Sequence, residues 1–541
     1  MKLRDALLAP LLFLLVFGVY STSPVHHSMD SRWSIHLVKS IITEGDLDLD
    51  EYNQIIASDD YRTEWVNGHR YSYFPIGTPV LAVPFVYFCS LVDARCRLGA
   101  EVIFSTAELV LGSFFASLAV VIIYFIGRFS LGSAKSIVLA LVFAFGTSAW
   151  SVGSRVLWQV TTSMLLLSTA LLILLAARRR PWLVQFAGIP LAYLYFVRPT
   201  NSISIALLTL YVFLEYWRFI FGYLLGAALV AAPFLWANLK IYGSLLTPYY
   251  APNRVGDTQH LLEALAGNVL SPNRGLLILS PVLLFSIVGI VLKARNVLLD
   301  KLDCALMLTV VFHWAAYASH TLWWGGWTFG PRQFTYMLPY FVFFLIPVVD
   351  RATNSTTGLL PVTFGMLLAA SMFIHYQGAT NPATFEWNYI PINLDLKPSR
   401  VWDWHDPQFL RGFTWFDRLV PQEIEVSPWS LAVLHPFGEN GTLPVPITIR
   451  LARGARFDWK AETVAGVTLA PDHGEGVTEV TPLVAVATTD YLLGTYRIGE
   501  IRISGRPSNT PAAEWRSVSA PVDPLVVLDR SYLPSIYGGA R

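Results

Sequence analysis

Charged residues are scarce in this chain. They make up 14% of its 541 residues, whereas 54% are hydrophobic. Soluble domains carry about 25% charged residues, so the composition excludes a soluble enzyme and indicates a protein that crosses a membrane many times. The 38 basic and 37 acidic residues nearly cancel, which removes the electrostatic basis for binding nucleic acid.

Cysteine is rarer still, with only Cys89, Cys96 and Cys304. Three cysteines make neither a disulfide framework nor a metal-binding set. Cys89 and Cys96 are able to pair if both face an oxidising compartment. A free buried thiol is the commoner state, and we expect it here.

Apolar segments are what the chain has in abundance. Clusters of Lys and Arg mark the cytoplasmic ends of membrane spans, and Arg178–Arg180 is the clearest such cluster. Alternating sides by this rule predicts eleven spans, at 7–20, 101–126, 136–150, 159–177, 183–197, 201–214, 219–238, 275–292, 303–321, 335–349 and 359–376. We interpret the first as a retained anchor, because no A-x-A cleavage site follows it.

One further apolar segment, 76–92, breaks the alternation of sides if it crosses the membrane. It also contains Pro79 and Pro84, which suit a regular span poorly. We therefore interpret it as a juxtamembrane or re-entrant piece on the outer face.

Two domains are predicted. Residues 1–376 form a transmembrane core whose polar first outer loop is 21–75. Residues 377–541 form an extracytoplasmic, mostly β domain. From Thr442 onward apolar residues alternate with polar ones between Gly, Pro and Asp, which is typical of antiparallel strands and predicts a small β-sandwich.

The unusual polar loops all fall on the outer side of the predicted membrane. A carrier places polar groups deep within its spans, whereas these spans are almost free of charge. The head group of a lipid-linked substrate lies at the height of these loops, which favours an enzyme acting at the membrane surface. A non-enzymatic transporter of lipid-linked glycans, or a cell-envelope assembly scaffold, is the alternative.

Asp30 is the first candidate for chemistry, because it follows the first helix by about ten residues. A carboxylate there is able to act as general base on an acceptor hydroxyl. It is equally able to cap the predicted helix 31–42, and the two roles are compatible.

Other acids and histidines in the first loop are weaker candidates. The run Glu44, Asp46, Asp48, Asp50 and Glu51 resembles part of a calcium loop but lacks the full pattern, so we favour a solvated turn. We interpret Asp59 and Asp60 as surface acids and His26 and His27 as structural. No metal ligand set is assigned, and a divalent cation has no support from the sequence.

Four arginines, Arg155, Arg198, Arg274 and Arg332, stand where predicted spans meet outer loops. A guanidinium suits a phosphate bidentately, but it also snorkels or pairs with acids. Their shared face favours a phosphate for at least one of them. The aromatic loop Trp323–Trp327 suits stacking on sugar rings, with an interfacial aromatic belt as the alternative.

Eight segments, in order, resemble the polytopic GT-C glycosyltransferases, in particular bacterial proteins similar to dolichyl-phosphate-mannose protein mannosyltransferases. The segments are DSRW, EGDLDLDEY, YSYFPIGTPVLAVPF, FAFGTSAWSVGSRVLWQ, FVRPTN, YGSLLTPYY, SPNRGLLILSPVLLF and WWGGWTFGPRQF. They cover most of residues 20–340.

The resemblance implies inverting transfer of a sugar from a polyprenyl-phosphate donor at the outer face of the cell (inner) membrane. It maps the catalytic acid onto Asp30 and the donor phosphate onto Arg332 and Arg274. Candidate cavity residues are Trp158, Gln159, Trp324, Trp327 and Tyr249. The D-E pair of the family is absent, because Ser31 follows Asp30, so the second acid and any metal are unassigned.

The acceptor implied by the resemblance is a glycan, a lipid or a protein. The C-terminal domain lies outside the matching segments and is a candidate for binding a glycan acceptor. The remaining partners expected are the lipids of the membrane itself.

Overall fold

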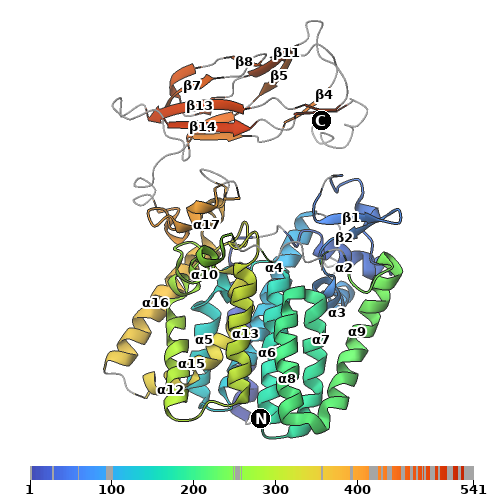
Figure 1. The fold of residues 1–541 in the computed structure, drawn as a ribbon, viewed down its shortest axis with the longest axis vertical. Coiled ribbons are helices and arrows are strands. Elements are labelled where there is room, and N and C mark those ends of the chain that lie inside the picture. The colour runs from blue at the N-terminus through green and yellow to red at the C-terminus, as the bar shows by residue number, and fades with distance from the viewer. Residues whose placement is uncertain are drawn as a thin grey trace. The chain divides into compact units, whose positions relative to one another are not determined.

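The structure is a computed structural model. It describes residues 3–26, 30–58, 60–92, 101–247, 249, 256, 259–354, 358–389, 394–395 and 397–413, together with strands between 424 and 528. The chain divides into two compact units, shown in Figure 1. The helical unit comprises Met1–Glu386 and Pro398–Phe413, and the β unit comprises Trp387–Lys397 and Thr414–Arg541.

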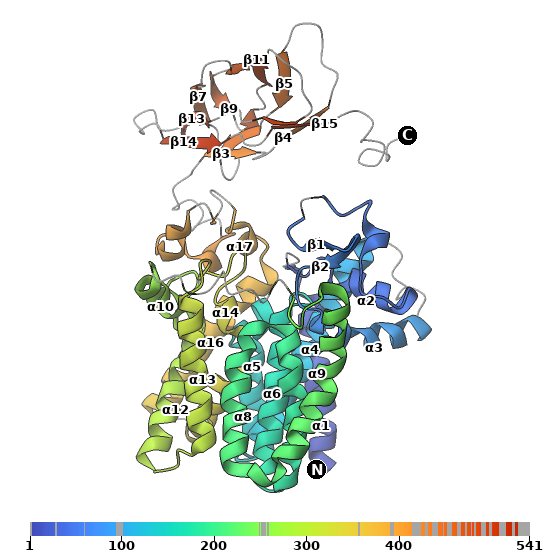
Figure 2. The same ribbon diagram turned by 45° about the vertical axis from the view of Figure 1, so that its right-hand side comes forward.

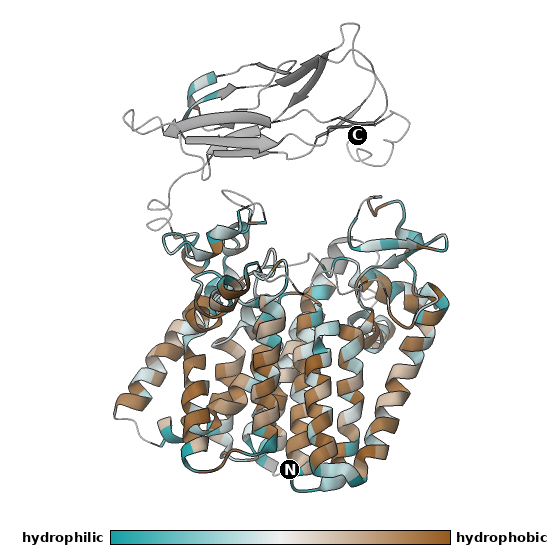
Figure 3. Ribbon diagram, viewed as in Figure 1, coloured by the Kyte–Doolittle hydropathy of each residue, from teal (hydrophilic) through white to brown (hydrophobic). Residues whose placement is uncertain are grey.

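Each of the eleven predicted spans contains a helix. These are α1 (Leu3–Thr22), α4 (Glu101–Gly127), α5 (Ser133–Phe145), α6 (Gln159–Ala177), α7 (Gly188–Val197), α8 (Ser202–Tyr216), α9 (Ile220–Tyr242), α12 (Leu284–Arg295), α13 (Lys301–Ala318), α15 (Leu338–Ala352) and α16 (Leu359–Thr380). They run side by side in one bundle (Figures 1 and 2). Hydrophobic residues dominate the bundle along its length (Figure 3).

Five stretches of helix are long and apolar enough to cross a membrane: Arg4–Thr22, Thr106–Gly127, Gln159–Ala177, Pro199–Tyr242 and Leu359–Thr380. Leu7, Leu11 and Leu14 of α1 are more than 60% exposed, as lipid-facing side chains are. The helical membrane protein predicted from composition is therefore confirmed in outline, while the number of eleven crossings stays a prediction.

Small residues let the helices of the bundle approach closely, as is common in membranes. A Cβ on Gly289 of α12 would lie 1.7 Å from the carbonyl oxygen of Phe344 on α15. The buried core continues through α4, α5 and α6, with Val120, Phe143 and Leu171 fully buried. The closely packed helices thus support the loops at the ends of the bundle.

The first loop, 21–75, folds into three short elements at one end of this bundle. They are α2 (Ser34–Thr43), the 3-10 turn η1 (Asp50–Tyr52) and the hairpin of β1 (Thr63–Val66) and β2 (His69–Ser72). Asn67 and Gly68 turn the hairpin with positive φ values of 52° and 88°, as a two-residue turn requires.

The helix that follows the hairpin, α3 (Gly77–Val92), runs across the bundle axis (Figure 2). The juxtamembrane or re-entrant position of 76–92 stays a prediction. Cys89 of α3 is disulfide-bonded, so the expectation of a free thiol is wrong there. Its candidate partner Cys96 lies outside the described residues, and Cys304 is free.

The β unit consists of short strands in four small sheets. The strands are β3 (Ile424–Ser427), β4 (Leu431–Leu434), β5 (Thr442–Pro446), β6 (Thr448–Leu451), β7 (Phe457–Glu462), β8 (Val467–Ala470), β9 (His473–Val477), β10 (Glu479–Val480), β11 (Leu483–Ala487), β12 (Gly494–Tyr496), β13 (Glu500–Pro507), β14 (Arg516–Pro521) and β15 (Leu525–Leu528). The largest sheet has the order β14-β13-β7-β9. Pairing is antiparallel except between β15 and β4, which agrees with the predicted strand pattern, and the sandwich arrangement stays a prediction.

Arg155 ties the end of α1 to the bundle. Its guanidinium donates to the carbonyl oxygens of Ser23 at 2.9 Å, Trp150 at 3.1 Å and Tyr20. The last carbonyls of a helix lack intrahelical partners and carry partial negative charge. Arg155 therefore closes the C-terminal end of α1, and this fully buried residue fixes where the first loop begins.

Replacing Arg155 by Met is expected to destabilise the helical unit, because each buried carbonyl left unpaired costs about 1–3 kcal/mol. Thermal unfolding of the purified protein in detergent checks this against Arg180→Met, which removes an exposed arginine. Equal melting temperatures for the two variants would contradict the role of Arg155 in closing α1.

Candidate functional site

A narrow cleft opens between the first loop, α3 and the start of α6. Its lining includes Asp30, Arg62, Thr78, Trp158 and Arg332. Asp30 forms an ion pair with Arg332 and accepts a hydrogen bond from the hydroxyl of Tyr61 at 3.3 Å. The side chains of Asp30 and Arg332 remain 25% and 15% exposed, so the pair faces the opening of the cleft.

Three separate parts of the chain deliver these groups. Asp30 stands in the turn that precedes α2, and Arg332 is the first residue of the short helix α14 (Arg332–Thr335). Trp158 is the N-cap of α6, and its ring lies 4.0 Å from the centre of the Arg332 guanidinium, which is a cation–π distance. The indole therefore orients Arg332 toward Asp30.

The predicted capping role of Asp30 is wrong. Helix α2 begins at Ser34, three residues later than the prediction requires, and its N-cap is Trp33 with no side-chain capping bond. A turn over residues 30–33 separates the carboxylate from the helix. Asp30 thus points into the cleft instead of toward the amides of α2.

The environment of Asp30 keeps it ionised. Burial alone would raise the pKa of its carboxyl, but the charge and hydrogen bond of Arg332 lower it, with help from Tyr61 and Arg198. The net effect is a pKa below the ordinary value of an aspartate. Asp30 is therefore a carboxylate at neutral pH, available to accept a proton once its partner is drawn away.

Arg198 supplies a second cation behind the pair. It is buried, its Nη2 donates to the Oε1 of Gln333 at 2.9 Å, and its guanidinium lies over the rings of Tyr317 and Tyr336. The Nη1 of Arg198 and the Nε of Arg332 are buried without a hydrogen-bond partner in the described part of the chain. Buried N–H groups of this kind call for acceptor oxygens, which a bound phosphate would provide.

Of the four candidate arginines, Arg332 lines the cleft, whereas Arg198, Arg155 and Arg274 lie outside its lining. Arg155 closes α1, as described above. Arg274 donates to the carbonyl oxygens of Trp324 at 2.8 Å and Gly326 at 3.2 Å and to the Oε1 of Gln408 at 2.8 Å. Four arginines that the sequence treats alike therefore have two kinds of partner, and Arg332 and Arg198 alone of the four face Asp30.

The candidate cavity residues are also divided. Trp158 and Gln159 line the cleft with Asp30, and the Nε2 of Gln159 is buried without a partner among the residues described. Tyr249 stands beside the cleft, its ring 5.4 Å from that of Phe74 in the cleft wall. Trp324 is buried, Trp327 is half-buried, and neither belongs to the cleft lining.

Several residues of the site were not predicted. Asp60, interpreted from the sequence as a surface acid, is nearly buried and pairs with Arg62 at 2.6 Å and with the indole of Trp33 at 2.9 Å. This fixes Arg62 in the cleft wall, and Tyr61 between them reaches Asp30. The alternation of acid, aromatic and base over 60–62 was the available signal. Asp59 and His27 lie outside the described residues, and His26 is exposed.

An apolar groove adjoins the cleft and shares Ser72, Phe74 and Pro75 with it. The far wall comes from α7 and α9, with Phe196, Phe234, Ile241 and Tyr242. Nearby on α9, Trp236 is 60% exposed, as suits contact with lipid. The cleft and the groove therefore share one wall, and the opposite wall of the groove includes residues of α9.

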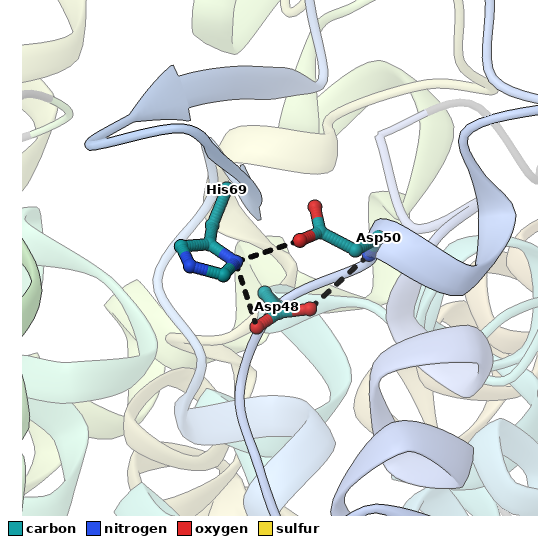
Figure 4. Close-up of side chains that lie close together, drawn as sticks. All are labelled: Asp48, Asp50 and His69. Atoms are coloured by element: carbon teal, nitrogen blue, oxygen red, sulfur yellow. Dashed lines mark hydrogen bonds and ion pairs between the residues drawn. The ribbon is translucent and has the colours of Figure 1, made fainter.

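The acidic run contains one group with the ligand types of a metal site. Ligand atoms of Asp48, Asp50 and His69 lie within 4.8 Å of one another (Figure 4). The Nδ1 of His69 is 2.7 Å from Asp50 and 3.7 Å from Asp48, and the amide of Asp50 donates to Asp48 at 3.2 Å. In this arrangement His69 of β2 forms ion pairs with Asp48 and Asp50 and so links β2 to residues 48–50.

Replacing His69 by Gln is expected to destabilise the protein in a pH-dependent way. The hydrogen bond and charge of Asp50, with the charge of Asp48, raise the pKa of His69 above its ordinary 6.5. The ion pair therefore contributes its full stability to the fold below the pKa that His69 has in the unfolded chain. This contribution is lost as the pH rises through the pKa of His69 in the folded protein. Melting temperatures should differ between His69→Gln and wild type at pH 6 and converge by about pH 9; an equal difference at both pH values would contradict this.

No family model matches the sequence, and neither does any curated protein. Solved structures of the Archaeoglobus fulgidus oligosaccharyltransferase do match. The form tethered to an acceptor peptide containing the NVT sequon aligns with a TM-score of 0.44 and 13% identity over 80% of this chain and 61% of that chain. The structure of the archaeal oligosaccharyltransferase AglB from Archaeoglobus fulgidus with an inhibitory peptide and a dolichol-phosphate aligns with a TM-score of 0.44 and 13% identity. This alignment covers 80% of this chain and 62% of that chain.

The complex of the same oligosaccharyltransferase with Zn and sulfate aligns with a TM-score of 0.45 and 14% identity over 80% of this chain and 60% of that chain. This chain spans about three fifths of the length of the solved chains that it matches. The likeness concerns the fold, and the chemistry of this chain depends on its own side chains.

Proposed function

We propose that this protein is a membrane glycosyltransferase that moves a sugar from a polyprenyl-phosphate donor to an acceptor hydroxyl at the outer face of the membrane. The observation that carries the proposal is the Asp30–Arg332 ion pair in the cleft. A base and a phosphate-binding cation in direct contact are the two groups that such a transfer needs.

In the proposed reaction, Asp30 accepts the proton of the acceptor hydroxyl as that oxygen attacks the anomeric carbon of the sugar. The bond between the anomeric carbon and the phosphate oxygen breaks, and its electron pair leaves with the lipid phosphate. Arg332 and Arg198 hold the added negative charge. A single displacement of this kind inverts the anomeric configuration.

The ion pair itself links donor binding to activation of the base. A lipid phosphate brings negative charge that competes with Asp30 for Arg332. Once Arg332 turns to the phosphate, Asp30 loses the partner that lowers its pKa and becomes a stronger base. The adjoining apolar groove supports a lipid-linked donor, because it shares one wall with the cleft and its opposite wall includes residues of α9.

Replacing Asp30 by Asn is expected to lower the transfer rate by about 10²- to 10⁴-fold, the usual range for a general base, while the donor still binds. The assay offers the purified full chain a panel of radiolabelled polyprenyl-phosphate sugars, with a membrane extract as acceptor. Asp46→Asn, which changes an acid of the same loop outside the cleft lining, is the matched control.

Unimpaired transfer by Asp30→Asn would remove Asp30 as the base. Saturable lipid binding without transfer from any donor, even by the wild-type protein, would instead indicate a transporter or scaffold.

Replacing Arg332 or Arg198 by Gln is expected to weaken binding of a polyprenyl phosphate that carries no sugar. Each loses a charge-assisted hydrogen bond worth about 1.5–3 kcal/mol, or roughly tenfold to a hundredfold in affinity. Competition against a labelled donor measures this, with Lys39→Gln as a control in α2, outside the cleft lining.

Varying both substrates completes the test. Because the phosphate releases Asp30, we expect ordered kinetics in which the donor binds before the acceptor. Random order, or unchanged lipid binding in both arginine variants, would contradict the proposed site.

A further inference from the structure

The loop that delivers Arg332 is held by two side chains outside the cleft. We propose that Arg274 and Gln408 form a clamp that positions residues 324–332, here called the Arg332 loop, for binding of the donor phosphate. The inference rests on the proposed function, because the clamp acts on catalysis only through Arg332. It gives Arg274, expected from the sequence to bind phosphate itself, a positioning role.

Gln408 makes every hydrogen bond that its side-chain amide allows. The Nε2 donates to the carbonyl oxygens of Thr328 at 2.9 Å and Thr384 at 2.7 Å. The Oε1 accepts from the amide of Gly330 at 3.3 Å and from Arg274 at 2.8 Å. The side chain is fully buried, so losing any of these bonds leaves buried polar groups unpaired.

Arg274 holds the other half of the same loop. Its Nε donates to the carbonyl oxygen of Trp324 at 2.8 Å and its Nη2 to that of Gly326 at 3.2 Å. Together the two side chains bind three carbonyl groups and one amide of the loop. Because Arg274 and Gln408 also bind each other, removing either side chain is expected to loosen the backbone of both halves of the loop.

The backbone of the Arg332 loop requires such support. Gly325, Gly326 and Gly330 have φ values of 80°, 67° and 62°, a conformation that glycine allows and that leaves the carbonyls of the loop outside any helix or sheet. The amide of Arg332 donates to the carbonyl oxygen of Gly330 at 2.9 Å. Gly330, bound by Gln408, is thus the direct link from the clamp to Arg332.

Gln408 also has an unusual place in the chain. It belongs to segment 398–413, which packs in the helical unit, whereas 387–397 before it and 414–541 after it belong to the β unit. The segment is fixed by hydrogen bonds from Ser271 to the carbonyl of Val401 and from the amide of Gln408 to Asn273, both 2.6 Å. Two of the three places where the chain passes between the units, 397/398 and 413/414, therefore lie at the ends of the segment that carries the clamp.

The first test measures the loop directly. Gln408→Met keeps the side-chain volume but removes every hydrogen bond, and we expect faster amide hydrogen exchange in peptides that cover 324–335. Asp406→Asn is the matched control, because Asp406 is buried in the same segment but pairs with Arg400 and Arg411 instead of the loop. Unchanged exchange in Gln408→Met, or the same increase in both variants, would overturn the clamp.

The second test separates positioning from general destabilisation. A displacement of about 1 Å costs roughly a hundredfold in rate, so Gln408→Met should lower kcat/KM for the donor by that order. In an Arg332→Gln background the same change should have no further effect, because the group it positions is gone. If the losses of kcat/KM from the two substitutions multiply in the double variant, Gln408 has a general structural role and the inference is overturned.

Gln408→Glu keeps the acceptor for Arg274 but loses the donation to Thr328 and Thr384, so its exchange and kinetics should fall between wild type and Gln408→Met. This milder change decides the question if Gln408→Met does not fold. A wild-type protein without transfer activity would refute the proposed function, while the exchange measurement would still test the clamp.

Discussion

The ion pair between Asp30 and Arg332 is the contact on which the proposed chemistry of the cleft depends. It joins residues 302 positions apart in the sequence, and each partner has its own support. Arg155 fixes the start of the first loop, and Tyr61 contacts Asp30, whereas Trp158 and the clamp orient Arg332. Desolvation makes partly buried ion pairs weak sources of stability. The number of contacts that position this one pair is better explained by a ligand that the pair binds than by its contribution to the stability of the fold.

The four candidate arginines differ in which of their N–H groups remain without a hydrogen-bond partner in the described chain. Carbonyl oxygens neutralise no charge, but they occupy the N–H groups of Arg155 and Arg274. Those two residues therefore organise backbone. Arg332 and Arg198 contact a carboxylate, an amide and aromatic rings, and Arg332 also donates to the carbonyl oxygen of Gly325 at 3.3 Å. Each keeps a buried N–H without a partner in the described chain. Because an anion needs both charge and free N–H groups, only this second pair suits a phosphate.

Sequence reasoning predicted the helices well because long apolar runs define them locally. That 76–92 does not cross the membrane, argued from the alternation of sides, and that Asp30 is the base, argued from its position after the first helix, stay predictions. Sequence reasoning did not separate the arginines, because their partners lie far away in the chain, as Ser23 does from Arg155 and Gln408 from Arg274. Asp60 and Gln408 were missed for the same reason: their burial depends on tertiary contacts that no local pattern encodes.

The resting state of the pair matters as much as its reacting state. With Arg332 held against it, Asp30 has a lowered pKa and is a poor base. On the proposed function, only a phosphate removes that restraint, so the base becomes effective when the donor already fills the cleft. The contact that joins the first loop to the Arg332 loop is then the one that the donor must break.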